Sequence, residues 1–213
     1  MRRLIDILVA LAGLMLLAPL LLVIATGLLL LQGRPLIYRQ KRLGLGGQPF
    51  LIMKFRTMDQ DADQVSSFDT SASTRMTPMG RLIKPMRLDE LPQLINLLMG
   101  HMTLVGPRPL SESHSKYLDQ STQKVLQSTK PGLTDPVALA FVAEDEVLAD
   151  TRSPEAMYLA LVLPEKARRQ VEYLGHRNAW RDLLVVLRTP TMLWSPRCRA
   201  ASARRVRQIL DLS

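Results

Sequence analysis

A long apolar run at the start of the chain restricts what the rest of the sequence can fold into. From Leu4 to Leu31, a stretch of 28 residues, the only ionisable side chain is Asp6. A straight helix of that length would measure about 42 Å, whereas the hydrocarbon core of a bilayer is about 30 Å thick. The run is also about twice as long as the apolar region of a signal peptide, and no clear cleavage site follows it. We therefore expect a retained membrane segment followed by a water-soluble part.

Pro19, preceded by Ala18, lies near the middle of this run. A proline inside a helix removes a hydrogen bond and clashes with the preceding turn, so we expect a kink or break there. Neither half would then be long enough to span a bilayer. Basic side chains flank both ends of the run: Arg2 and Arg3 before it, and Arg34, Arg39, Lys41 and Arg42 after it. This pattern favours a bent helix that enters and leaves on the cytoplasmic face, although periodicity alone fits a bitopic anchor equally well.

Composition narrows the classes of function. The chain has 28 Lys and Arg against 19 Asp and Glu, which gives a net charge of +9. Such a charge suits nucleic acid, an anionic membrane surface or a phosphorylated substrate, and the membrane segment favours the last two. With a single cysteine, Cys198, and three scattered histidines, the sequence excludes a disulfide framework and a zinc site.

The soluble part is predicted to combine one β-hairpin with several helices. Residues 37–41 and 49–55 are short β-favouring runs, separated by LGLGG, whose glycines permit positive φ. A polar stretch over 59–77 predicts a loop that could act as a lid. Helical patterns follow over residues 79–84, 91–99, 112–129, 144–163 and 165–193.

The C-terminal region favours contact with a membrane surface. Residues 165–193 are amphipathic and include Trp180, and Trp194 follows them. A basic tail continues with Arg197, Arg199, Arg204, Arg205 and Arg207. Aromatic and basic side chains of this kind suit an anionic bilayer interface, although a charge run is more often a solvated face.

Two adjacent carboxylates, Asp89 and Glu90, follow a basic stretch that ends at Arg87. We expect them at a helix N-terminus, because Pro92 suits the first turn of a helix. The free N–H groups there can hold a phosphate or lower a carboxylate pKa. One carboxylate could then attack while its neighbour holds a metal. For an arbitrary Asp-Glu pair, complementarity with the helix dipole is the commoner explanation, so the pair alone decides nothing.

Longer motifs give these carboxylates a context. In order after the membrane segment come QKRLGLGGQPFLIMKFRTM (40–58), RLDELPQLINLLMG (87–100) and TLVGPRP (103–109). Together they resemble the bacterial sugar transferase family, whose members are monotopic phosphoglycosyl transferases that begin the assembly of bacterial surface glycans. KPGLTD (130–135) and VEYLGHRNAWRDLLVVL (171–187) also look like that family, so the resemblance covers essentially the whole chain.

The resemblance implies a reaction in which a UDP-sugar gives its sugar phosphate to undecaprenyl phosphate, with release of UMP. The family pattern makes Asp89 the nucleophile, which forms a covalent phosphosugar intermediate, and makes Glu90 the residue that helps to bind Mg²⁺. A covalent intermediate would let one site serve a soluble nucleotide and a membrane lipid in turn. Magnesium suits such a site, because it prefers carboxylate and phosphate oxygens.

The expected substrate-binding residues are basic side chains within the motifs. They are Lys54, Arg56, Arg87 and Arg108, with Pro107 and Pro109 framing Arg108. Arginine suits bidentate contacts with phosphate. The two prolines would restrict the backbone and so direct the arginine between them.

Three departures from the family pattern stand out. The family commonly has Ser-Pro where this chain has Ala18-Pro19, and Gly-Asp-Met-Ser where this chain has His101 in place of the acidic residue. After PGLT many members continue with a Gly-Trp-Ala-Gln-Val-like stretch, but this chain has DPVALAF, Asp135 to Phe141. We expect the last departure to mark a distinct subgroup with its own sugar specificity.

These observations predict an α+β, mostly helical, membrane-bound enzyme. Residues 1–33 are expected to form a re-entrant membrane helix broken near Pro19. Residues 34–213 are expected to form the cytoplasmic phosphoglycosyl transferase domain, with a small β-hairpin, amphipathic interfacial helices and a basic tail at the membrane surface. The predicted location is the cytoplasmic face of the bacterial inner membrane. The predicted partners are a UDP-sugar, undecaprenyl phosphate and anionic lipid, without nucleic acid, and a homodimer is left open.

Two alternatives come from other classes of protein. A non-catalytic, membrane-anchored basic scaffold would explain the charge but not the DELPQ or GPRP motifs. A nucleic-acid-binding regulator would fit the pI of 10.2, but aromatic residues make up only 5% and no binding motif is present. The transferred sugar stays open, as does the pathway, whether exopolysaccharide, capsule, O-antigen or glycoprotein.

Overall fold

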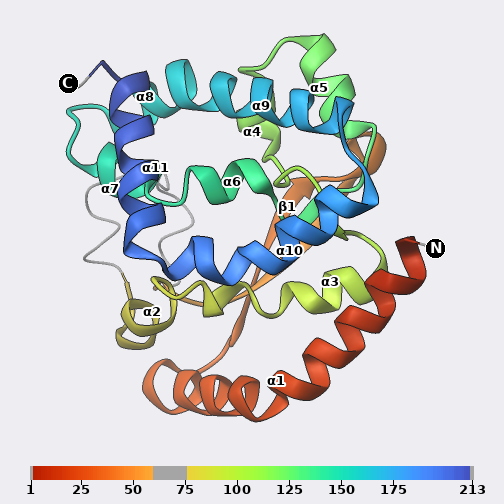
Figure 1. Cartoon of the computed structure of the whole chain (residues 1–213). Helices are drawn as coiled ribbons and strands as arrows, with labels where there is room; N and C mark the ends of the chain where they lie inside the picture. The colour runs from red at the N-terminus through yellow and green to blue at the C-terminus, as the bar shows by residue number, and fades with distance from the viewer. Residues whose placement is uncertain (1, 60–75, 212–213) are drawn as a thin grey trace.

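The computed structural model describes residues 2–59 and 76–211 and is mostly helical, with two two-stranded sheets (Figure 1). The mostly helical α+β prediction is confirmed. Most of the loop and candidate lid predicted over residues 59–77 lies outside the described residues. The elements are α1 Arg2–Gln32, β1 Ile37–Leu43, η1 Leu45–Gly47, β2 Pro49–Phe55, α2 Pro78–Ile83, η4 Leu88–Glu90, α3 Gln93–Met99, β3 Thr103–Val105, α4 Glu112–Ser115, α5 Gln120–Gln127, β4 Gly132–Thr134, α6 Pro136–Ala140, α7 Glu144–Ala149, α8 Pro154–Met157, η5 Tyr158–Val162, α9 Leu163–Gly175, α10 Ala179–Trp194 and α11 Pro196–Ile209.

Helix α1 is long and apolar enough to cross a membrane, and most of it is exposed. Its most apolar 18-residue window has a mean hydropathy of 3.0, and only 11% of that window is buried. The low burial distinguishes it from the core helix of a soluble protein. The helix continues through Ala18 and Pro19, so the expected break is a change of direction between its two halves rather than an interruption (Figure 1).

Both halves of α1 pack against the soluble part of the chain. In the N-terminal half, Ala10 shares a buried apolar cluster with Leu97 of α3. In the C-terminal half, Leu28 shares another with Phe55 of β2. Helix α1 is therefore also part of the interior of the folded chain.

The one acidic residue of α1 makes buried contacts. Asp6 is 5% exposed, and its carboxylate accepts hydrogen bonds from Thr103 Oγ1, at 3.1 and 3.2 Å, and from the Leu104 N–H, at 2.9 Å. The Arg3 guanidinium nearby donates to two carbonyls of α3, each at 2.6 Å. A buried carboxylate needs such donors, and they explain how an ionisable side chain is accommodated in this run.

The predicted hairpin is confirmed. Strands β1 and β2 are antiparallel, and their register pairs Ile37 with Phe55 and Leu43 with Pro49. Gly46 and Gly47, in the turn between them, adopt φ values of 64° and 73°, as expected from the LGLGG sequence. Fully buried Asn96 then fixes α3 to β2, because its side chain accepts from the Met53 N–H at 2.9 Å and donates to the Leu51 carbonyl at 2.7 Å.

A second pairing was not predicted. Strands β3 and β4 are parallel, with Thr103 opposite Gly132 and Val105 opposite Thr134. Each strand has three residues, too few to show a period-2 pattern. The pair places the GPRP segment, which follows β3, beside the KPGLTD segment, which contains β4.

Three predicted helices are divided in the structure. The pattern over 112–129 becomes α4 and α5, since Asp119 caps α5 by accepting from the Thr122 N–H at 2.9 Å. The pattern over 165–193 becomes α9 and α10, since Asn178 caps α10 by accepting from the Arg181 N–H at 2.8 Å. The pattern over 144–163 becomes α7, α8 and the π-helical segment η5. In the first two patterns, a side-chain cap begins a new helix inside a stretch predicted as one helix.

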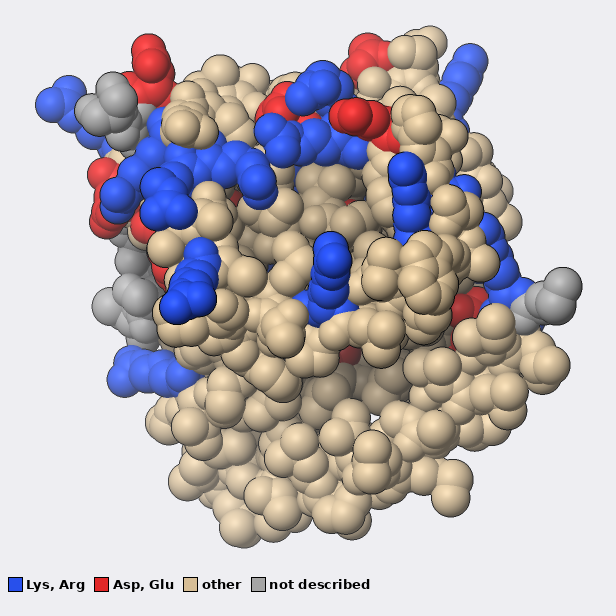
Figure 2. All heavy atoms as spheres, in the orientation of Figure 1, with Lys and Arg blue, Asp and Glu red and all other residues tan. Residues whose placement is uncertain are grey.

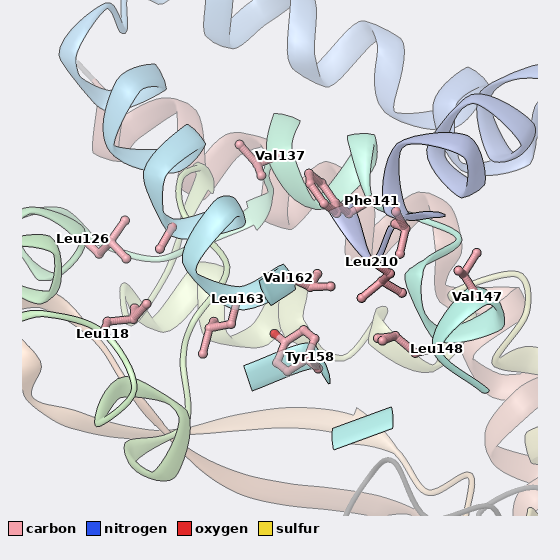
Figure 3. Packing of buried hydrophobic residues seen from close by; sticks show 12 residues of the cluster. Leu118, Leu126, Val137, Phe141, Val147, Leu148, Tyr158, Val162, Leu163 and Leu210 are labelled. Atoms are coloured by element: carbon pink, nitrogen blue, oxygen red, sulfur yellow. The ribbon is translucent and has the colours of Figure 1, made fainter. Parts of the chain in front are cut away.

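The main core lies away from α1, among α5 to α9 and α11 (Figure 3). Phe141, Leu148, Tyr158 and Val162 are central to it. Helix α11 contributes Val206 and Leu210, so the predicted basic tail is a packed helix. In Figure 1 this helix runs away from α1.

Candidate active site

The two predicted catalytic carboxylates lie in η4, a single 3₁₀ turn between α2 and α3. They immediately precede α3, which begins at Gln93 with Pro92 as its N-cap, so they lie next to the expected helix N-terminus, in a separate turn. Arg87, the residue before this turn, has φ 57° and ψ 21°. A left-handed conformation at a non-glycine residue costs about 1–3 kcal/mol, and such residues are enriched at functional sites. Here it turns the chain directly before Asp89.

Three basic side chains converge on Glu90. Lys54 Nζ of β2 lies 3.0 Å from Glu90 Oε1, and Arg108 Nη2, from the loop after β3, lies 2.6 Å from the same oxygen. Arg87 Nη1 lies 3.7 Å from it. The structure thus brings together four of the predicted site residues from separate parts of the chain. Pro107 and Pro109, which flank Arg108, are both buried.

These contacts keep Glu90 charged. Burial favours the neutral acid, but Arg108, Lys54 and Arg87 outweigh it and hold the pKa of Glu90 well below its usual range. In return, the charge of Glu90 raises the pKa of Arg108. Burial lowers the pKa of Lys54, and Glu90 opposes that shift. Glu90 therefore organises the cations as a fixed negative charge.

Asp89 differs from its neighbour. It is 7% exposed, and burial, with a smaller contribution from the charge of Glu90, raises the pKa of Asp89 to about 6. Lys54 and Arg87 oppose that shift. Within residues 2–59 and 76–211, no hydrogen bond or ion pair engages its carboxylate. Asp89 therefore combines an available carboxylate with a basic surrounding, as a nucleophile toward an anionic phosphate requires.

Arg56 lies apart from the Glu90 group. It is 6% exposed, and its guanidinium donates to the backbone carbonyls of Gln32, Gly33 and Arg34 at the end of α1. Gln32 Nε2 donates back to the Arg56 carbonyl at 2.8 Å. Arg56 thus fastens α1 to β2, and its expected contact with substrate stays a prediction.

His101, the substituted position in the GHMT segment, is exposed beside Phe50, with ring centroids 5.8 Å apart.

Arg42 was missed as a site residue. Burial and the nearby charge of Arg108 lower the pKa of Arg42, and Glu90 opposes the shift, so this side chain lies within the field of the site. Its Nη2 donates to Gln40 Oε1 at 2.6 Å. The hairpin register pairs Tyr38 with Lys54, and alternation along β1 puts Arg42 on the same face. Knowledge of that register would have placed Arg42 on the face of the hairpin that carries Lys54.

The donor set fits a magnesium ion that takes most of its ligands from substrate and water. In the described ranges, no group of three or more His, Cys, Asp and Glu side chains could hold a metal. Magnesium does not need such a group, since it commonly binds through one or two carboxylates plus substrate phosphates. Asp89 and Glu90 supply two adjacent carboxylates.

Comparisons with known proteins identify the family of the chain. The model of a family described as bacterial sugar transferase matches residues 1–196. The chain belongs to the bacterial sugar transferase family. The match ends where α11 begins, so this transferase carries its arginine-rich helix outside the matched range.

Several relatives of this sugar transferase are named as enzymes. It is 36% identical to a UDP-glucose:undecaprenyl-phosphate glucose-1-phosphate transferase of Caulobacter vibrioides, over 90% of this chain and 69% of the relative. An Escherichia coli protein of the same name is 31% identical, over 89% of this chain and 39% of the relative. A UDP-N-acetylgalactosamine-undecaprenyl-phosphate N-acetylgalactosaminephosphotransferase of Aeromonas hydrophila is also 31% identical, over 88% and 42%. This chain therefore spans less than half of the latter two.

Proposed function

We propose that this sugar transferase moves a sugar phosphate from a UDP-sugar to undecaprenyl phosphate and releases UMP. The relatives named above carry these substrates in their names. The observation that carries the proposal is the convergence of Lys54, Arg87 and Arg108 on Glu90, directly beside the available carboxylate of Asp89. Such a group can bind a diphosphate and present a nucleophile to it.

In the first step, an Asp89 carboxylate oxygen attacks the phosphorus that bears the sugar. The bond between this phosphorus and the bridging oxygen breaks, and UMP leaves with the electron pair. The product is an aspartyl phosphosugar. In the second step, an oxygen of undecaprenyl phosphate attacks the same phosphorus, which gives undecaprenyl diphosphate sugar and regenerates the Asp89 carboxylate.

The basic side chains support both steps. A carboxylate and a diphosphate repel each other, so the charge that develops on the phosphoryl oxygens needs cations nearby. Lys54, Arg87 and Arg108 supply them, and Arg42 adds to the field. Glu90, with Asp89 beside it, would hold Mg²⁺, which would neutralise charge on the diphosphate.

We infer that α1 is re-entrant. Arg3, near its start, bonds to α3, and Gln32, at its end, bonds to the Arg56 carbonyl. A helix that crossed the bilayer once would carry its two ends to opposite sides of the membrane, where they could not contact one polar domain. With basic flanks at both ends, the domain belongs on the cytoplasmic face of the inner membrane. There the lipid phosphate is within reach.

The test is UMP release by protein purified in nanodiscs, with a panel of UDP-sugars, undecaprenyl phosphate and Mg²⁺. We expect sustained turnover with at least one donor, dependent on lipid and abolished by chelation. Asp89→Asn should stop turnover, because an amide cannot act as this nucleophile. Full activity of that variant would exclude the aspartyl intermediate. Absence of turnover in folded wild-type protein with every donor would favour the scaffold hypothesis.

A further inference from the structure

The loop that carries Arg108 is joined closely to strand β4 and the residue after it. The Gly106 N–H donates to the Thr134 carbonyl at 3.1 Å, and the Gly132 N–H donates to the Pro107 carbonyl at 3.0 Å. A Cβ placed on Gly132 would lie 2.1 Å from the Gly106 nitrogen, so the two backbones meet without space for a side chain. The loop therefore follows the position of β4.

The next residue, Asp135, adds a side-chain link to the same loop. It is 4% exposed, and its Oδ2 accepts from the Arg108 N–H at 3.0 Å and from Gln170 Nε2. Its Oδ1 accepts from the Val137 N–H at 2.8 Å and so caps α6. Gln170, from α9, is itself 5% exposed. One buried carboxylate thus connects the active-site loop, the start of α6 and the middle of α9.

We propose that Asp135, held by Gln170, is a positioning residue that fixes the peptide of Arg108 and so directs its guanidinium to Glu90. The inference rests on the function proposed above. Fixing the Arg108 N–H fixes the Cα from which the side chain extends, and that side chain ends 2.6 Å from Glu90 Oε1. The first residue of the DPVALAF segment would thus position the active-site loop.

Asp135→Asn separates the two tasks of this carboxylate. Asparagine caps helices about as well as aspartate, so its oxygen can keep the bond to the Val137 N–H. Its amide group would then face the Arg108 N–H, which loses its acceptor. We expect kcat for UMP release to fall by about 10- to 100-fold, with a much smaller change in KM, because misplacing a supporting group affects chemistry at that scale.

The matched control is Asp119→Asn, which alters the exposed cap of α5, where the carboxylate bonds only to Ser121 and Thr122 among the described residues, and should leave kcat unchanged. A double-mutant cycle with Arg108→Lys distinguishes positioning from general weakening of the fold. If Asp135 acts through Arg108, its substitution should have little further effect in the Arg108→Lys background. Hydrogen exchange provides a readout without turnover: the Arg108 amide should exchange faster in Asp135→Asn, while the exchange of α5 is unchanged.

Wild-type kcat in Asp135→Asn, additive effects in the cycle, or an unchanged Arg108 amide would each overturn the proposal. If Asp135→Asn does not fold, Gln170→Met keeps the carboxylate and removes only its side-chain donor. It should lower kcat by about threefold to tenfold, and an unchanged kcat would overturn the proposal. Failure of wild-type turnover would count against the proposed function instead, and hydrogen exchange would still test the positioning.

Discussion

Two basic regions of this molecule show how differently the same side chains can be used. Around Glu90, three cations from separate elements lie within 3.7 Å of one carboxylate oxygen. On α11, five arginines follow one another along a single helix, and Arg197, Arg204 and Arg207 are exposed. Lys and Arg gather on the upper part of the face in Figure 2, and the lower part, over α1, is bare of charge. Net charge does not distinguish the two regions, whereas convergence on one buried carboxylate does, and it is the reason that Lys54, Arg87 and Arg108 are proposed to act on substrate.

The sharpest contrast should come from removing one carboxylate in each region. Glu90→Gln leaves three cations around a neutral amide, so we expect kcat to fall by about 100-fold and stability by about 3 kcal/mol. Glu146→Gln removes the partner of Arg199 on α11. We expect kcat to stay the same and the free energy of unfolding to change by no more than about 0.5 kcal/mol. UMP release and urea unfolding measure both. Equal effects in the two variants would show that the two basic regions do not differ in this way.

Replacing one cation in each region should give the next largest difference. Lys54→Met removes charge and keeps most of the side-chain volume, so we expect kcat/KM for the UDP-sugar to fall by about 10- to 100-fold. Arg204→Met on α11 is the control and should leave kcat/KM unchanged. A matching loss in the control would mean that long-range charge, rather than position, drives binding.

The pH dependence should separate Asp89 from Glu90. With a pKa of about 6, Asp89 is mostly ionised at pH 7, and turnover should fall about tenfold between pH 7.5 and pH 5. The folded pKa lies above the unfolded value of 3.8, so this group lowers stability at high pH and ceases to do so as pH falls. Asp89→Asn should therefore be inactive but more stable at pH 8, by about 2 kcal/mol, with the difference lost below about pH 4. Thermal unfolding across that range tests the sign. Glu90, whose pKa is lowered in the folded protein, adds stability at high pH, and this stability is lost as the pH falls.

The smallest effects belong to the outer face of α11. Changing Arg197, Arg204 and Arg207 to Gln together should leave turnover in neutral nanodiscs unchanged and stability within about 0.5 kcal/mol. Binding to vesicles rich in anionic lipid should weaken by up to about 1 kcal/mol for each arginine that reaches the surface. Liposome flotation at two salt concentrations measures this loss. Lost turnover in neutral nanodiscs would show that α11 serves the active site.

The residues of the site were predictable where a motif carried them, and their arrangement was not. Lys54, Glu90 and Arg108 were expected from separate motifs, and the structure brings them together. The left-handed turn at Arg87 and the link from Asp135 to the Arg108 peptide depend on tertiary contacts, which no local pattern records.

For the fold, local signals worked where they were strong. The LGLGG turn predicted the hairpin, and the apolar run predicted α1. Strands β3 and β4, of three residues each, are too short to show an alternating pattern, and the caps at Asp119 and Asn178 divided helical patterns that looked continuous. Arg56 was expected to bind substrate, which stays a prediction; its bonds to the carbonyls at the end of α1 depend on tertiary packing that its motif does not reveal.

Helix α1 completes two buried clusters of the soluble part, and this has a consequence for how the protein is made. The chain leaves the ribosome with its N-terminus first, so α1 emerges before the segments that contain Phe55 and Leu97 can pack on it. The catalytic domain must then assemble on a helix that is already in place. With α1 in the bilayer, as proposed, the membrane would hold part of the interior of the folded protein, and α1 would be more than a tether.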